Sequence, residues 1–80
     1  MKINVLFFSL LRDIAGTDCL ETSFDGKTVN DLLGSLYQQF PALSEWDKNL
    51  LIAVNTEYAG RDDRISEGDE IALMPPVQGG

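Results

Sequence analysis

Residues 28–41 have the sequence TVNDLLGSLYQQFP and predict the one long helix around which the fold is built. Thr28 is a suitable N-cap, because its hydroxyl can accept a hydrogen bond from a free N–H of the first turn. Asp31 lies at the third helical position, where an acid is favoured. Pro41 ends the helix. The apolar side chains recur with helical spacing and form one stripe, which we expect to face the core: Val29, Leu32, Leu33, Leu36, Tyr37 and Phe40.

Segments with the composition of β-strands lie on both sides of this helix. Two precede it, at residues 2–8 and 20–24, and a helical turn over residues 10–15, ended by Gly16, separates them. An irregular segment around Trp46 follows the helix, and strands are then expected at residues 50–54, around Tyr58 and at residues 70–74. This order favours an α+β domain of residues 1–74, in which one helix packs across a single sheet.

Alternation in the first and last strands predicts an outward-facing set: Lys2, Asn4, Leu6, Phe8, Glu70, Ala72 and Met74. Both strands are rich in apolar residues, as central strands usually are. If the two strands are neighbours, Phe8 and Met74 lie on the same exposed face. An exposed apolar patch of this kind is typical of a contact surface.

The chain ends in Pro75-Pro76-Val77-Gln78-Gly79-Gly80, which predicts an extended tail. Adjacent prolines hold the backbone extended and cannot donate to a sheet ladder, so regular structure should stop near Met74. The two glycines have no Cβ, and they can therefore pass through a channel too narrow for other residues. Stiffness also lowers the entropy lost when such a tail is bound.

Composition excludes several kinds of function. The formal net charge is −7, which disfavours nucleic acid and anionic membranes and favours a basic protein partner. The chain has no His and one Cys, so it has neither a Cys-His pair nor a usual zinc site. Cys19 is interpreted as a small apolar residue of a strand, and its free thiol suits a reducing compartment. The apolar start is too short and polar for a membrane span and has no cleavage site, so a cytoplasmic protein is expected.

The residues from Gly68 to Gly80, GDEIALMPPVQGG, closely resemble the ending of MoaD-type sulfur carriers, the small subunits of molybdopterin synthase. Residues 5–8 (VLFF), Arg12, Gly16 and residues 53–55 (AVN) match the same family in the same order. The resemblance covers essentially the whole chain. It implies a ubiquitin-like β-grasp fold, with a mixed sheet and one main helix packed across it.

The resemblance also implies a chemistry. A ubiquitin-activating-type adenylyltransferase uses ATP and Mg²⁺ to adenylate the terminal glycine, and sulfur from a persulfide donor displaces AMP to leave a thiocarboxylate. The molybdopterin synthase large subunit then receives the tail and transfers its sulfur to cyclic pyranopterin monophosphate. Two small and two large subunits form the complex. By this resemblance the chain is not catalytic alone and itself binds no cofactor and no metal.

Carried over to this sequence, the resemblance makes Gly80 the acyl carrier and Gly79 the residue that provides clearance. Pro75, Pro76, Val77 and Gln78 span the distance to the partner's active site. The expected partner interface consists of Phe8, Tyr58 and Met74, although the family often has Phe where Met74 stands. The sequence also contains an acidic cluster: Asp62, Asp63, Glu67, Asp69 and Glu70. These residues either speed the association with a basic partner or are ordinary solvent-exposed charges.

Three alternatives remain open from the sequence. A Gly-Gly terminus is shared with the thiamine sulfur carrier and with ubiquitin, so the chain could serve another sulfur pathway or become attached to lysine as a protein modifier. In the third alternative the chain is a non-covalent interaction module, and its Gly-Gly end is incidental.

Overall fold

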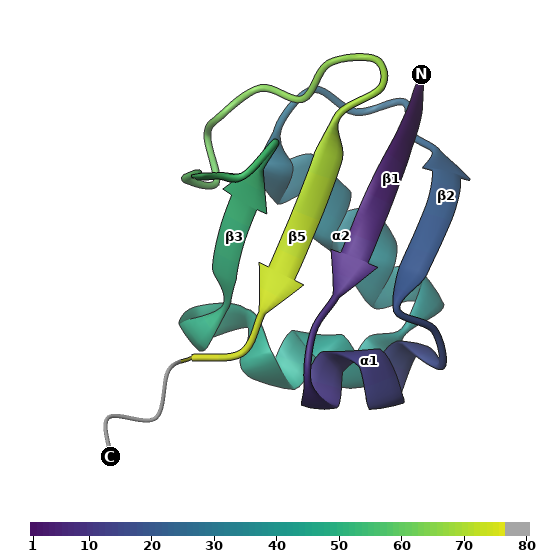
Figure 1. The fold of residues 1–80 in the computed structure, drawn as a ribbon, viewed down its shortest axis with the longest axis vertical. Coiled ribbons are helices and arrows are strands. Elements are labelled where there is room, and N and C mark those ends of the chain that lie inside the picture. Colours follow the sequence, from purple (N-terminus) through teal and green to yellow (C-terminus); the bar gives the residue numbers. More distant parts are fainter. Residues whose placement is uncertain (77–80) are drawn as a thin grey trace.

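The computed structural model describes residues 1–76, which form one five-stranded sheet with the order β2-β1-β5-β3-β4. The strands are β1 (Lys2–Phe7), β2 (Cys19–Ser23), β3 (Leu51–Val54), β4 (Glu57–Tyr58) and β5 (Glu70–Met74). The pair β1 and β5 is parallel and the other pairs are antiparallel, so the sheet is mixed. Helix α2 (Val29–Gln39) crosses one face of this sheet, and α1 (Leu10–Ala15) lies at its lower end (Figure 1). The predicted α+β class is confirmed.

Helix α2 begins as the sequence predicts. Thr28 Oγ1 accepts from the Asp31 N–H at 3.3 Å, while the Asp31 carboxylate accepts from the N–H groups of Lys27 and Thr28 at 3.0 and 3.1 Å. These bonds, first from Lys27 and then from Thr28, lower the pKa of the Asp31 carboxyl group. The result is a complete capping box, which satisfies N–H groups that the helix itself cannot pair.

The loop after β4 completes the cap of α2. The N–H groups of Val29 and Asn30 donate to the carbonyl oxygens of Asp63 and Arg61, each at 2.9 Å. A distant part of the chain therefore supplies acceptors for the first turn of the helix, and the loop is held against the helix in return.

The core lies between the sheet and α2. The apolar stripe of the helix meets the inward side of β1 and β5, where every second residue is almost completely buried, as the alternation predicts. The side chains with less than 2% exposure include Val5, Leu32, Leu36, Ile71 and Leu73. Phe7 packs edge-on against Phe40 with ring centroids 5.9 Å apart.

Most predicted boundaries agree with the structure to within one residue, and α1 ends at Gly16 in the left-handed conformation. Two segments differ. Residues around Trp46 form a 3₁₀ helix, η1 (Pro41–Asn49), where the sequence predicted irregular structure. Phe8 is not part of β1, although its N–H still donates to the Leu73 carbonyl at 3.1 Å and continues the parallel ladder.

A polar cluster ties α2, η1 and the loop after β4 together. The Tyr37 hydroxyl donates to Asp47 Oδ1 at 2.5 Å, and Arg61 Nη1 donates to the same oxygen at 2.9 Å. The Arg61 guanidinium also donates to the Asp47 carbonyl. Partial burial, followed by the bond to Asp47, raises the pKa of Tyr37 to about 12. The bond from Tyr37, aided by Arg61, lowers the pKa of Asp47.

The hairpin between β3 and β4 has a two-residue turn, Asn55-Thr56, and both residues have positive φ, 51° and 73°. Such turns match the twist of the strands, but a β-branched residue at positive φ is strained. Two side-chain hydrogen bonds stabilise Asn55 in this conformation. Its amide donates to Asp69 Oδ1 at 2.8 Å, and its side-chain oxygen accepts from the Glu70 N–H at 2.9 Å. Thr56 is the strained member of the turn.

Thr56→Gly should therefore raise the free energy of unfolding by about 0.5–1 kcal/mol, because glycine adopts positive φ without the clash of a branched Cβ. The matched control is Asn55→Gly, which relieves the same kind of backbone conformation but removes two hydrogen bonds and should lower stability by about 1 kcal/mol. Urea denaturation measures both. Equal effects of the two variants would contradict this interpretation of the turn.

The Tyr37 cluster predicts a loss of stability at alkaline pH. The folded state favours the neutral phenol, with a pKa of about 12 against 10.0 in its ordinary state. The corresponding stabilisation is present below pH 10.0 and is lost as the pH rises toward 12. The stability difference between wild type and Tyr37→Phe should shrink between about pH 9 and about pH 11 in denaturation experiments. Tyr58→Phe, at an exposed tyrosine, is the control, and a constant difference for Tyr37→Phe would refute the prediction.

Candidate functional site: an apolar hollow on the open face of the sheet

The sheet face away from α2 carries a hollow whose floor is made of two alanines. Ala72 of β5 and Ala53 of β3 are directly paired across the strands. On one side Ala72 is also paired with Leu6 of β1, and on the other Ala53 is paired with Tyr58 of β4. One row across four strands thus has small residues in the middle and large ones at both ends.

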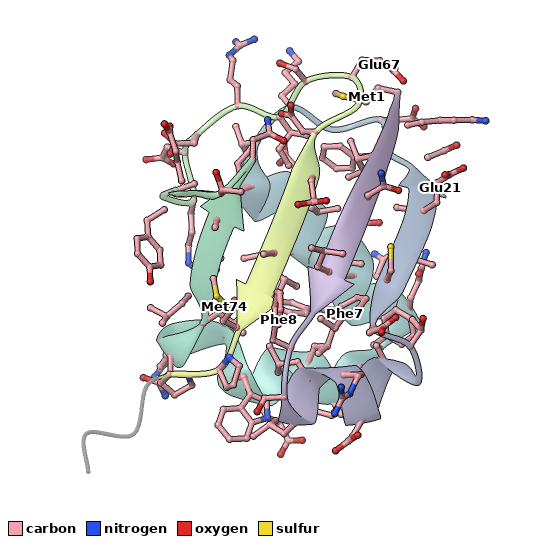
Figure 2. All side chains as sticks on the ribbon, in the orientation of Figure 1. Met1, Phe7, Phe8, Glu21, Glu67 and Met74 are labelled. Atoms are coloured by element: carbon pink, nitrogen blue, oxygen red, sulfur yellow. The ribbon has the colours of Figure 1, made fainter. Side chains whose placement is uncertain are left out.

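Phe8 and Met74 close one end of this hollow. Residues at the ends of parallel neighbours lie at the same edge of a sheet, and the bond from the Phe8 N–H to the Leu73 carbonyl brings the two side chains together. Figure 2 shows Phe8 and Met74 at the ends of β1 and β5. At the opposite end the lining residues are Thr56 and Glu70. The hollow has a volume of about 310 Å³.

The three predicted interface residues therefore lie in one place. Phe8, Tyr58 and Met74 all line the hollow, and Phe8 and Tyr58 are 44% and 79% exposed. Single exposed apolar side chains are common, but large ones gathered in one patch are typical of a contact surface. Their role in binding a partner stays a prediction.

Sequence reasoning missed other parts of the hollow. It placed Leu6 and Ala72 on the outward face but assigned them no role, and it did not single out Ala53 or Thr56. Ala53 belongs to residues 53–55, which match the MoaD-type sulfur carriers. This match was the signal that could have pointed to Ala53. The position of Thr56 depends on the turn geometry, which no strand alternation encodes.

The hollow lies where the chain leaves the sheet. Met74 is the last residue of β5 and lines the hollow, and the partly exposed Pro75 and Pro76 follow it directly. Of the predicted tail, Val77, Gln78, Gly79 and Gly80 lie outside the described residues. The assignment of residues 75–80 to a tail, and the role of Gly80, remain predictions.

The motifs that carried the resemblance meet in space. Asn55, from one motif, bonds through its side chain to Asp69 and Glu70, from the other, and its N–H donates to the Glu70 carbonyl at 2.8 Å. This contact fixes the hairpin turn against the start of β5. It therefore fixes Tyr58 relative to Met74 as well.

The predicted acidic cluster has partly structural functions. The Asp63 carboxylate accepts from the Gly60 N–H, and the Asp69 carboxylate accepts from the Ser66 N–H. Glu67 accepts from the Lys2 N–H at 3.0 Å. Asp63 and Asp69 thus close local turns, whereas Glu67 ties its loop to the start of β1. Of the cluster only Glu70 lines the hollow.

The predicted strand position of Cys19 is confirmed. It lies on β2, paired with Leu6, and its side chain is exposed on the outer face. Within residues 1–76 no three His, Cys, Asp or Glu side chains are grouped so as to hold a metal ion. None of the helices in this described part of the chain is both long and apolar enough to cross a membrane.

Comparison with known proteins shows the family. The model of the ThiS family matches residues 5–80. The chain belongs to the ThiS family. A curated relative from Escherichia coli (strain K12), the molybdopterin synthase sulfur carrier subunit, is 41% identical over 98% of this chain and 99% of its own. The relative of the same name from Chlamydomonas reinhardtii is 38% identical over the full length of both.

Solved structures agree with this ThiS-family assignment. SAMP1 of Haloferax volcanii, a small archaeal modifier protein, is 32% identical and superimposes with a TM-score of 0.85 over all of both chains. A chain from the complex of subunits 1 and 2 of molybdopterin-converting factor from Helicobacter pylori is 26% identical, with a TM-score of 0.68 over all of both chains. The expected ubiquitin-like β-grasp fold is confirmed by these matches.

The structure predicts opposite outcomes for two adjacent phenylalanines. Phe7→Ala should lower the free energy of unfolding by about 3–5 kcal/mol, because Phe7 is 2% exposed and packs against Phe40. Phe8→Ala should lower it by less than about 1 kcal/mol, since Phe8 is 44% exposed and does not belong to the buried core. Chemical denaturation compares the two, and a cost for Phe8→Ala as large as that for Phe7→Ala would show that Phe8 belongs to the core.

Proposed function

We propose that this ThiS-family chain is the sulfur carrier subunit of a molybdopterin synthase. The observation that carries the proposal is the 41% identity to the E. coli sulfur carrier subunit over nearly the full length of both chains. The name is shared by the relatives from Chlamydomonas reinhardtii and Haemophilus influenzae. In this function the chain is not catalytic by itself; it supplies a group that other proteins charge and consume.

The group carried is sulfur on the acyl carbon of Gly80. An ionised carboxylate is a poor acyl electrophile, so it first attacks the α-phosphorus of ATP, releases pyrophosphate and becomes an acyl-adenylate. A persulfide sulfur then attacks the acyl carbon and AMP leaves. After a thiol has cleaved the remaining S–S bond, the product is a thiocarboxylate. Its sulfur goes to cyclic pyranopterin monophosphate, on the way to molybdenum cofactor.

In this function the tail carries the sulfur and the hollow binds the partner. Gly80 carries the acyl group, Gly79 provides clearance in a narrow channel, and residues 75–78 span the distance to the partner's active site. The hollow with Phe8, Tyr58 and Met74 is the docking surface at the origin of the tail. Docking there fixes where the tail enters the partner, because Met74 lines the hollow and the tail begins at the next residue.

The partners follow from the chemistry. A large subunit holds the pterin substrate, and the Helicobacter pylori structure, a complex of subunits 1 and 2 of molybdopterin-converting factor, supports such a partner. A ubiquitin-activating-type adenylyltransferase brings ATP and Mg²⁺, and a persulfide donor brings sulfur, so this chain needs no cofactor of its own. We further propose a cytoplasmic complex of two small and two large subunits, without nucleic acid or membrane as partners.

A second candidate function is attachment to other proteins. The 32% identity to SAMP1, a small archaeal modifier protein, favours it, since a modifier uses the same activated terminus and ends as an isopeptide on lysine. A third is sulfur delivery to another pathway such as thiamine. Intact-mass analysis of the protein from cells distinguishes these outcomes: a carrier gains the mass difference of one sulfur for one oxygen, whereas a modifier appears joined to other proteins. Complementation of strains deficient in either cofactor separates the two sulfur pathways.

The direct test is to mix the protein with ATP, Mg²⁺ and an adenylating enzyme of the ubiquitin-activating type, and to locate AMP by mass spectrometry. AMP should be attached at Gly80, and a chain lacking Gly80 should acquire none. Replacement of Gly79 and Gly80 by alanine should lower the rate of sulfur transfer about 100-fold, because the reacting carbon is misplaced in its channel. Transfer at the wild-type rate by the alanine variant would refute the proposed role of the glycines.

A further inference from the structure

The hollow is a recess in the surface and not a flat apolar patch. Leu6 and Tyr58 form its side walls and are separated by three strand spacings, about 14 Å between their backbones. Between them Ala72 and Ala53 offer only methyl groups. A flat contact surface would have large side chains at these central positions, so the small floor creates the recess.

Size and chemistry indicate what fits the recess. Its volume of about 310 Å³ is at the lower limit of small-molecule sites, which also carry several convergent polar groups. Here, apart from the hydroxyl of Tyr58 in the wall, the described polar lining consists of Thr56 and Glu70, both at one end. A single large apolar side chain, entering from another protein, suits these walls better than a metabolite does. Such buried anchors supply much of the binding energy at protein interfaces.

Charge indicates what surrounds that side chain. Glu70 is the charged residue among the described residues that line the recess, and the whole chain has a net charge of −7. An acidic rim and an acidic chain are complementary to a basic counter-surface. The partner should therefore present an apolar side chain next to a Lys or Arg that faces Glu70.

We propose that the alanine-floored recess between Leu6 and Tyr58 receives one large apolar side chain of the large subunit, flanked by a basic residue at Glu70. The inference rests on the proposed function, since it names the partner's chemistry at the docking surface. According to this proposal, binding requires that the side chains of this chain leave the recess unfilled. An apolar surface alone is not sufficient.

The test is therefore a substitution that adds apolar surface and should nevertheless weaken binding. Ala72→Leu fills the recess, and we expect the dissociation constant for the large subunit to rise at least about tenfold, because overpacking excludes the partner's side chain. Ala72→Ser keeps the recess open and should change it less than about threefold. Ser23→Leu adds the same side chain elsewhere on the outer face, where Ser23 is paired with Lys2, and should leave binding unchanged.

Ala53→Val fills the recess from the neighbouring strand and provides a second test should Ala72→Leu lower the melting temperature. Glu70→Gln should weaken binding at low salt, and the difference should disappear at high salt, as expected for an exposed charge pair. Binding of Ala72→Leu and Ala53→Val at wild-type strength would overturn the proposal and leave the carrier function intact. If the wild-type chain itself did not bind the large subunit, the proposed function would fail and this inference with it.

Discussion

The parallel pairing of β1 with β5 is the constraint on which the rest of the molecule depends. It joins residues near the two ends of the chain, in a register that matches Val5 with Ile71 and Phe7 with Leu73. Because side chains alternate, this register places one apolar row against α2 and the other on the open face. A shift of one residue would exchange the two rows and remove both the core and the hollow.

The pairing also explains why the docking surface lies next to the tail. Parallel strands end at the same edge of the sheet, so the residue directly after β1 and the last residue of β5 are brought together even though they are far apart in sequence (Figure 1). Phe8 and Met74 are those residues. The proposed function needs a surface that binds a partner and a terminus that enters it, and one edge of one sheet supplies both.

Polar contacts outside the sheet hold the remaining wall of the hollow. Asn55 fixes the β3–β4 turn to the start of β5, and the loop after β4 caps α2 through its carbonyl oxygens. Arg61, in the same loop, bonds to Asp47 beside Tyr37. β4 has only two residues and could not hold Tyr58 in place by its ladder alone. These contacts on both sides of β4 explain how so short an edge strand presents an exposed aromatic residue in a defined position.

The amino-acid sequence by itself determined the helix of α2 with its capping residues, the strands with their inward and outward faces, and the Gly-Gly ending with the resemblance that it carries. These features arise from interactions between near neighbours or from composition, and they can be predicted locally. Only the tertiary structure decided that Ala53 faces Ala72, that Arg61 reaches Asp47, that Cys19 is exposed, and that residues 41–49 form a 3₁₀ helix. Each of the first three depends on which strands or loops become neighbours, and the last on how the chain packs beside α2 and α1. Such pairings are set by long-range contacts, to which a short stretch of sequence contributes only one side.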